Sequence, residues 1–422
     1  MIPAPAVPPR RTIARRSIGR MTSSLAVRNY RLYFWGQSIS IAGTWMQTLA
    51  LAFLVLRLNG GGGELGIVIA ARFLPMVLLG PAGGAFADRH DKRRLLYVTQ
   101  SASAGVALVF ALLIALNVIT MGAVLILSLT LGSLTVFDSP ARQSFIPELV
   151  PRDQVPNAIT LNSVSINLAR VLGSAVGGGL IAAVGLAACF AINALSFVAV
   201  LVSLALMRTA ELYPADRPPS EKGQVRAGLR YAWRTPALLL PLIMVTVTGT
   251  LAWEFPITLP LIAQGAFHGD ASTYAAMAAV MGAGAVVGGL VVAGRAAQPT
   301  AAALAGASVG WGVAILAAAS APTLPWELAA LLFVGYGSVA FNAQAKTTLQ
   351  LASVPSMRGR VMALWALAWG GTTVIGGPLV GWVAQILGSR WSLVVGGLPT
   401  VAIGLVLLPA LRRIDRRTLP DL

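Results

Sequence analysis

The chain consists of long apolar runs separated by short polar segments. The runs are about 20 residues long, enough for a helix to cross about 30 Å of hydrocarbon. They are continuously apolar and do not alternate with polar positions, which excludes a membrane β-barrel. We therefore predict an all-α polytopic membrane protein. Its twelve transmembrane helices are expected near residues 32–57, 65–87, 94–116, 120–138, 157–183, 187–207, 239–263, 273–294, 299–320, 325–343, 361–385 and 391–411.

The longest polar segment divides the twelve helices into two sets of six. This segment is rich in proline and arginine, so we expect a linker, with a short amphipathic helix around 224–234. The predicted organisation is a basic N-terminal tail at 1–31, a six-helix half at 32–207, a linker at 208–238, a second six-helix half at 239–411 and a tail at 412–422.

The two halves share an internal repeat. At one constant shift, 141-ARQSFIPELVP-151 falls on 345-AKTTLQLASVP-355, and 173-GSAVG-177 falls on 377-GPLVG-381. Two parallel six-helix halves are a transporter architecture, in which the substrate site lies near the midplane between the halves. The sequence therefore favours two pseudo-repeat halves around a central site.

Four glycine pairs with GxxxG spacing occupy equivalent helices of the two halves. This spacing lets helix backbones approach closely in lipid, although glycine is common here, with 44 residues, and chance placement is the alternative. The predicted helix-packing pairs are Gly80 and Gly84, Gly173 and Gly177, Gly284 and Gly288, and Gly377 and Gly381.

Composition and charge strengthen the membrane interpretation. The chain is 56% hydrophobic and 11% charged, whereas soluble domains are about 25% charged. Most of the 31 Lys and Arg residues fall in the tails and in every second connection, and the alternate connections contain only Arg390. This is the positive-inside pattern, so the net charge of +17 reflects topology, not nucleic-acid binding. We expect a multi-pass protein of the cytoplasmic (inner) membrane with both termini cytoplasmic.

Residues for covalent or metal chemistry are sparse. The chain has two histidines, His90 and His268, which are far apart, and a single cysteine, Cys189. It has no phosphate-cradling G-x-x-x-x-G-K-[ST] segment and no Cys/His cluster. We therefore expect no enzyme activity, no cofactor and no metal, and instead a monomer whose partners are a small molecule, a coupling ion and membrane lipids.

A charged stretch between the second and third predicted helices stands out. Six of the seven residues in 88–94 are charged, and two of the six are acids, which topology alone does not require. Asp138, the only acid of the fourth helix, is expected at the same membrane surface and needs a cation, for which Arg89 or Arg93 is the nearest supply. We interpret Lys92 and Arg94 as plain membrane anchors.

This stretch, 84-GAFADRHDKR-93, resembles the loop 2–3 signature of the major facilitator superfamily. Asp91 in place of the usual glycine is similar to the branch of enterobactin exporters and macrolide or multidrug (Tap-like) efflux proteins. The segments 140-PARQSFIPELVPRDQVPNA-158 and 167-NLARVLGSAVGG-178 also look like that branch, although Ser174 stands where drug–proton antiporters usually carry proline. The resemblance covers roughly residues 30 to 410.

The resemblance implies a conformational latch at the cytoplasmic surface. In that family the signature ties neighbouring helices together only while the cytoplasmic side is closed. The latch residues are expected to be Gly84, Asp88, Arg89, Arg93 and Asp138, with Asp88 placed at the start of the eleventh helix. Simple positive-inside anchoring is the alternative.

Three charges lie inside predicted helices and are candidates for coupling or substrate binding. Glu254 sits beside Pro256 and Pro260, and a buried carboxylate readily takes up a proton. Because the outer ends of helices 1, 2, 7 and 8 converge in this superfamily, Arg72 is expected to be its alternate partner; a static pair is the other interpretation. Arg170 is expected to face an anionic substrate group or Asp138.

The resemblance also implies which helices line the central cavity, namely the first, fourth, seventh and tenth. The lining candidates are Gln37, Ser40, Trp45, Gln47, Thr48, Trp253, Tyr336 and Asn342, with interior packing as the alternative for each. Taken together, the expected function is secondary transport by alternating access, with proton-coupled efflux of small amphipathic compounds such as drugs or siderophore-like metabolites. The alternatives are a lipid or lysophospholipid translocator of the same fold and a non-transporting membrane scaffold.

Overall fold

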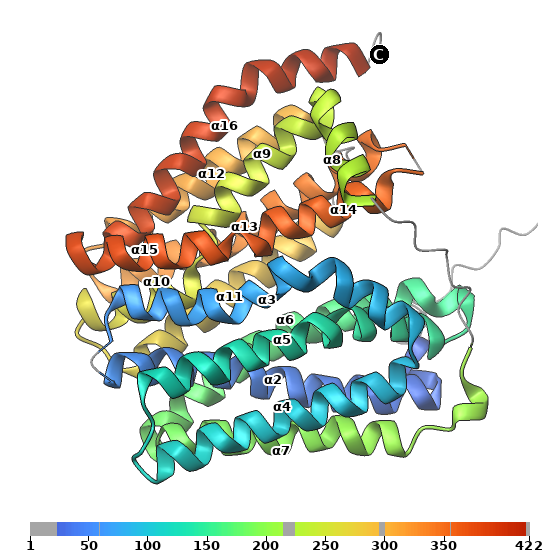
Figure 1. Ribbon diagram of the computed structural model, residues 1–422. Helices are drawn as coiled ribbons and strands as arrows, with labels where there is room; N and C mark the ends of the chain where they lie inside the picture. The colour runs from blue at the N-terminus through green and yellow to red at the C-terminus, as the bar shows by residue number, and fades with distance from the viewer. Residues whose placement is uncertain (1–22, 59, 214–223, 295–299, 355, 419–422) are drawn as a thin grey trace, which may run out of the picture.

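The computed structural model describes residues 23–418, apart from 59, 214–223, 295–299 and 355 (Figure 1). Within that part the chain is helical, and it has twelve stretches long and apolar enough to cross a membrane, which confirms the predicted fold. Much of the predicted N-terminal tail and of the linker, residues 1–22 and 214–223, lies outside the described residues.

The first half forms six membrane helices. They are α2 (Arg28–Arg57), α3 (Gly62–Arg89), α4 (Lys92–Ala115), α5 (Met121–Phe145), α6 (Val155–Ala183) and α7 (Leu186–Ala205). Helix α5 continues several residues beyond the predicted end at 138, because hydropathy marks only the apolar part of a helix. The extension carries Arg142, which therefore projects from the same helix face as Asp138, one turn away.

The second half also makes six crossings, two of them broken. Its elements are α9 (Pro236–Leu251) with α10 (Phe255–Gly265), α11 (Ala271–Gly294), α12 (Ala301–Ala319), α13 (Leu324–Ala352), α14 (Arg358–Ala366) with a π-helical segment (Leu367–Gly371) and α15 (Thr373–Leu387), and α16 (Trp391–Thr418). The amphipathic helix expected near 224–234 is α8 (Gln224–Arg234), which packs against α14 and α9.

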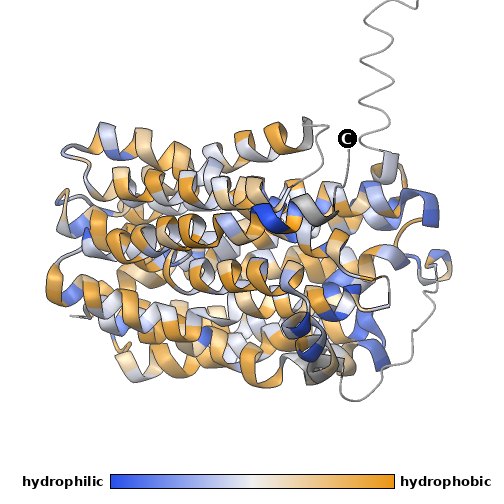
Figure 2. Cartoon of the chain, turned by 90° about the horizontal axis from the view of Figure 1, so that it is seen from above, coloured by the Kyte–Doolittle hydropathy of each residue, from blue (hydrophilic) through white to orange (hydrophobic). Residues whose placement is uncertain are grey.

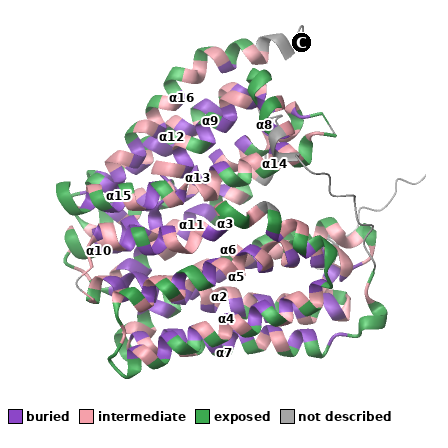
Figure 3. Cartoon of the chain, viewed as in Figure 1, coloured by how far each residue is buried: buried purple, intermediate pink, exposed green. Residues whose placement is uncertain are grey.

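Side-chain burial fits a bundle surrounded by lipid. Buried residues follow the helix faces that meet one another, whereas exposed residues follow the outer faces (Figure 3). Many exposed side chains are large and apolar, for example Leu195, Ile375 and Val406, each about 70% exposed. Hydrophobic positions dominate along the helices and hydrophilic ones gather toward one end of the bundle (Figure 2). That end carries the basic connections, as the positive-inside pattern predicts.

The two broken crossings lie against each other. The seventh crossing is interrupted at 252–254, where Pro256 lacks the N–H that would continue the helix. The eleventh crossing widens into the π-helical segment, and Gly249 of α9 packs on the carbonyls of Ala368 and Trp369 within it. Such π segments occur frequently at functional sites.

The halves meet along α3 and α15, which lie side by side in Figure 1. At the end without basic loops, a Cβ on Gly62 or Gly66 would lie 2.2–2.3 Å from the carbonyl oxygen of Gly381 or Gly377, and the Gly63 N–H donates to Gln385 Oε1 at 2.9 Å. Toward the basic end, Cβ atoms on Gly80 and Gly84 would meet nothing within 4 Å. Along α3 and α15, the halves are therefore sealed at one end and parted at the other.

Candidate substrate and coupling site

A cavity of about 410 Å³ opens within the first half. Its wall comes from α2 to α7, and Pro256 of α10 is the one lining residue contributed by the second half in the described part of the chain. Of the residues predicted to line it, Gln37, Trp45 and Thr48 do so. The cavity runs from Arg72 and Pro256 at mid-membrane toward Gln143 and Asn162 at the basic end.

Ser40 and Gln47 lie on a different face of α2, so their prediction as lining residues is wrong for this conformation. Gln47 accepts a hydrogen bond from the Asn193 side chain of α7, and both Ser40 and Gln47 are buried. Gly36 and Gly43 lie on the same helical stripe and also pack on α7. The spacing of three or four residues in this stripe marks the face that packs inside the half.

The predicted lining residues of the second half also lie off the cavity wall. Trp253 packs in an aromatic cluster, with its ring centroid 4.5 Å from that of Trp369. The backbone of Tyr336 lies against Gly288. The buried Asn342 Oδ1 has no hydrogen-bond partner among the described residues. The aromatic cluster, which sequence analysis missed, consists of Trp253, Phe255, Trp311, Phe341, Trp365 and Trp369.

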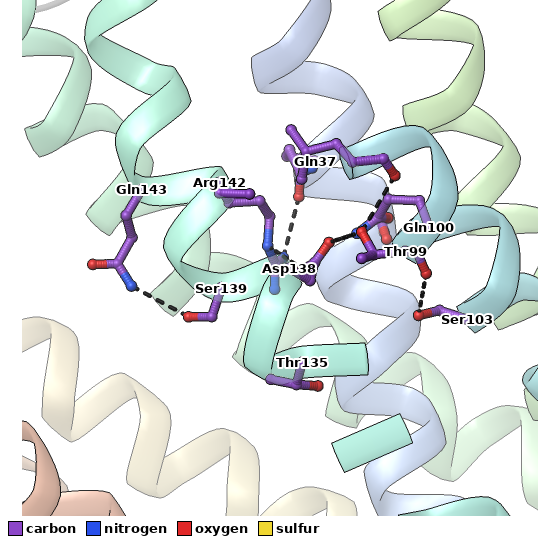
Figure 4. A network of polar contacts seen from close by, with 12 residues as sticks. Gln37, Thr99, Gln100, Ser103, Thr135, Asp138, Ser139, Arg142 and Gln143 are labelled. Carbon is purple, nitrogen blue, oxygen red and sulfur yellow. Dashed lines mark hydrogen bonds and ion pairs between the residues drawn. The ribbon is translucent and has the colours of Figure 1, made fainter. Parts of the chain in front are cut away.

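Asp138 is the centre of a polar network on the cavity wall (Figure 4). Its carboxylate accepts from Arg142 Nε at 2.7 Å, from Thr99 Oγ1 at 2.8 Å and from Gln100 Nε2 at 2.7 Å. Arg142 also donates to Gln37 Oε1 at 3.3 Å. The network ties α2, α4 and α5 together and leaves the buried carboxylate fully partnered.

The expected pairing of Asp138 with Arg89 or Arg93 is absent from this conformation. Arg142, one turn along the same helix, supplies the cation instead. Arg93 donates to the Leu204 carbonyl at the end of α7, at 2.7 and 3.0 Å. In the described part of the chain, the side chains of Asp88 and Arg89 are exposed and make no hydrogen bond or ion pair, so Asp88 does not cap the eleventh helix.

Lys92 is more than a membrane anchor, which corrects the prediction. It is 8% exposed and forms an ion pair with Glu148, in the connection between α5 and α6. The Glu148 carbonyl also accepts from the Tyr213 N–H at 2.9 Å. The resemblance of the segment 140–158 drew attention to this connection but implied no role for Glu148. Arg94 is exposed, and its backbone N–H is capped by Asp91.

The glycine pairs separate into two groups. Gly173 and Gly177 of α6 pack on the backbone of α2, and Gly284 and Gly288 of α11 pack on α13. Gly377 and Gly381 form the sealed end against α3. The expectation of close packing fails for Gly80 and Gly84, because the two halves have parted there.

Glu254 ends the break in the seventh crossing and is 2% exposed. Its Oε1 has no hydrogen-bond partner among the described residues and lies 3.0 Å from where a Cβ on Gly376 would be. Thr373 of α15 is within hydrogen-bonding reach of the carboxylate. The expected Arg72–Glu254 pair is not formed, because Glu254 turns toward α15 and away from the cavity.

The two arginines within the first half lack acidic partners in the described chain. Arg72 lines the cavity and its guanidinium donates only a long bond, 3.5 Å, to Thr48 Oγ1. The Arg170 guanidinium lies 4.6 Å from the ring centroid of Trp45 and pairs with neither Asp138 nor another acid. No group of three potential metal ligands occurs among the described residues.

Comparison with known proteins places this arrangement in a family. A family described as transmembrane secretion effector matches residues 21–419. The multidrug efflux pump Tap of Mycobacterium tuberculosis is 26% identical over 405 residues, covering 91% of this chain and 94% of that protein. The staphyloferrin A transporter of Staphylococcus aureus is 32% identical over 187 residues, 44% of this chain. That match spans about half the length of the relative, 47%.

Solved structures share the fold at low sequence identity. A bacterial homologue of the human lysosomal transporter Spinster, in an inward-facing and unoccupied conformation, has a TM-score of 0.72 at 14% identity, covering 95% of this chain and 99% of that one. The nucleoside transporter NupG has a TM-score of 0.73 at 12% identity, covering 92% and 99%. With the family match across nearly the whole chain, these findings confirm the resemblance: the chain belongs to the transmembrane secretion effector family of major facilitator superfamily transporters.

Proposed function

We propose that this protein is a secondary transporter that exports small amphipathic compounds across the cytoplasmic membrane by alternating access, with protons as the coupling ion. The observation that carries the proposal is the asymmetric contact between α3 and α15. Glycine-mediated backbone contacts seal one end, and the other end is parted. With the basic end in the cytoplasm, this is an inward-open state in which the cavity can load from the cytoplasm.

The outward-open state requires the seal and the parted end to exchange roles. The glycine contacts between α3 and α15 are suited to this exchange, because few interlocking side chains would have to separate there. Asp88, Arg89 and Gly84 stand free at the parted end and are available to contact the second half when it closes. We assign them, with Arg93 and Asp138, to a latch that forms only on closure.

Glu254 is the residue assigned to proton coupling. Its carboxylate is buried at the break between α9 and α10, and one oxygen lacks a partner in the described chain. Ionising such a group costs free energy unless a cation or hydrogen-bond donors approach it. Because α10 contributes Pro256 to the cavity wall, a change of charge at Glu254 is two residues from the substrate space.

The relatives support the direction and the kind of cargo. Tap is named as a multidrug efflux pump, and a relative from Streptococcus pyogenes, 23% identical over 272 residues, is named as a macrolide efflux protein. The staphyloferrin A transporter is named for a siderophore. Export of drug-like or siderophore-like compounds is therefore the proposal for this chain.

Transport in proteoliposomes tests the proposal. Purified protein is reconstituted with an imposed pH gradient, and accumulation of a panel of drugs, siderophores and lipids is compared with that in protein-free liposomes. We expect at least one compound to accumulate only when the gradient is present. Flux that merely follows the compound's own gradient at channel-like rates would indicate a pore and overturn the proposal.

A further inference from the structure

Arg72 lies in the cavity wall, where its backbone packs closely on α5. A Cβ on Gly132 of α5 would lie 2.1 Å from the Arg72 carbonyl oxygen, so α3 and α5 pack backbone to backbone at this residue. Its guanidinium has five N–H donors, yet its one hydrogen bond is the 3.5 Å contact with Thr48 Oγ1. The side chain therefore presents most of its donors to the cavity.

No carboxylate of the described chain balances this charge. Asp138 is occupied by Arg142, Thr99 and Gln100, and it lies six residues along α5 from Gly132, about 9 Å by helix rise. Glu254 faces Gly376 on α15. An arginine without a counter-anion inside a membrane protein is costly, and such residues characteristically mark substrate or ion pathways.

The surroundings of Arg72 combine one charge with an apolar wall. Ile69, Phe73, Met76 and Leu131 line the cavity beside it, together with Pro256 from the second half. Trp45 also lines the cavity, and the Arg170 guanidinium lies 4.6 Å from the centroid of its ring. A guanidinium binds carboxylate or phosphate in a bidentate manner, whereas the wall suits an apolar body.

We infer that Arg72 binds the anionic group of the transported compound, so that the preferred substrates are amphipathic anions that carry a carboxylate or a phosphate. The inference rests on the proposed transport function and names its substrate class. Because Pro256 lines the same cavity, such a substrate can also contact the break that carries Glu254. The anion thus replaces the acidic partner that the chain does not provide for Arg72.

The test uses probes of one shape and different charge. Binding of 1-naphthaleneacetate, 1-naphthyl phosphate, 1-naphthaleneacetamide and 1-naphthylmethylammonium is measured by calorimetry in nanodiscs of uncharged lipid. We expect the two anions to bind at least about tenfold more tightly than the amide, as for a hydrogen bond to a charged group. The ammonium should bind most weakly. Oleoyl lysophosphatidate as a fifth probe separates a lipid source of the phosphate from a free one.

Variants assign the preference to Arg72. Arg72→Gln should make the anions and the amide bind equally, and Arg72→Lys should keep part of the preference. Arg57→Gln, which removes an exposed arginine at the outer end of α2, is the matched control and should change nothing. Equal binding of all probes by the wild type, or a preference that survives in Arg72→Gln, would overturn the inference.

Two outcomes separate this inference from the transport proposal. Arg72-dependent binding of anions without gradient-driven accumulation would reject proton-coupled transport and support the anion site. Gradient-driven accumulation of ethidium, a cation, that Arg72→Gln leaves unchanged, together with no charge preference in binding, would support transport and overturn the anion site. Because the wild-type probes alone reveal the charge preference, the test does not depend on any variant folding.

Discussion

Two of the buried carboxylates in the membrane helices, Asp138 and Glu254, have opposite surroundings. Asp138 accepts three side-chain hydrogen bonds, one from an arginine, and ties three helices of the first half together. Glu254 is even less exposed, 2% against 5%, but one of its oxygens has no partner in the described chain. Burial alone therefore does not separate these two acids, whereas the number of their hydrogen-bond partners does.

The contrast extends to the helices that carry the two acids. Asp138 lies within the uninterrupted helix α5, whereas Glu254 lies at a break, beside the π-helical segment of the neighbouring crossing. A partnered charge in a regular helix resists change, since removing it leaves donors unsatisfied. An acid at a break, with one oxygen unpartnered, has fewer contacts to rearrange when its charge changes. We therefore expect neutralisation of Glu254 to affect mainly transport and neutralisation of Asp138 to affect mainly stability.

The largest expected effect is on transport by Glu254→Gln. Because the amide cannot release a proton, gradient-driven accumulation in proteoliposomes should fall to that of protein-free vesicles. Binding of substrate should persist, and Glu254→Asp should retain part of the accumulation. Glu64→Gln, at the outer end of α3, is a control acid that lies off the cavity wall. If Glu254→Gln still accumulates substrate against a pH gradient, coupling resides elsewhere.

The next effect is on stability, which we expect to depend more on Asp138 than on Glu254. Asp138→Asn removes the acceptor of Arg142, Thr99 and Gln100, and we expect a loss of about 2–3 kcal/mol in the free energy of unfolding. This lies below the range for a fully buried pair because the Arg142 side chain is 31% exposed. Glu254→Gln should change it by less than about 1 kcal/mol. Denaturant titration in detergent compares the two variants. Equal losses in the free energy of unfolding would contradict the distinction between the two acids.

The sequence was sufficient to predict the fold, whereas it placed the substrate site between the halves and the cavity lies within the first half. Twelve apolar runs, the alternation of basic loops and the repeat come from properties summed over many residues, so single errors do not matter. The predicted pairing of Glu254 with Arg72 required information that summed properties do not contain. It depended on how α10 is rotated after the break, and the direction of one side chain there is set by packing against Gly376, which no local pattern encodes.

The face of α2 that packs on α7 could have been recognised from the sequence. Residues 36, 40, 43 and 47 recur with helical spacing and are small or amide side chains, which marks a packing face toward α7. Gln37, Thr44 and Thr48 form the neighbouring stripe on the cavity. Polarity alone did not separate these two faces, because both contain Ser, Thr or Gln. A periodicity test would have excluded Ser40 and Gln47.

A smaller effect separates two bases of the charged stretch between α3 and α4. Lys92→Gln leaves Glu148, 18% exposed, without its cation, and we expect a loss of about 1–2 kcal/mol in the free energy of unfolding. Arg94→Gln at an exposed position should cost less than about 0.5 kcal/mol. The shift in thermal unfolding midpoint of the two variants measures the difference. A similar small shift for both would return Lys92 to the role of a surface anchor.

The smallest effect concerns a third acid, Asp270, which is partnered like Asp138 but exposed like a loop residue. Hydrogen bonds from the Ser272 hydroxyl and from the Thr273 and Ser272 N–H groups at the start of α11 lower the pKa of Asp270. A lowered pKa in the folded state contributes stability above the unfolded value, near 3.9, and loses it as pH falls through the folded value. The wild type should therefore exceed Asp270→Ala by less than about 1 kcal/mol at pH 6, as for a helix cap. This advantage should shrink below about pH 4. If the difference between their unfolding midpoints does not narrow from pH 6 to pH 3, the cap acts without its charge. The number of hydrogen-bond partners then matters only for acids inside the membrane.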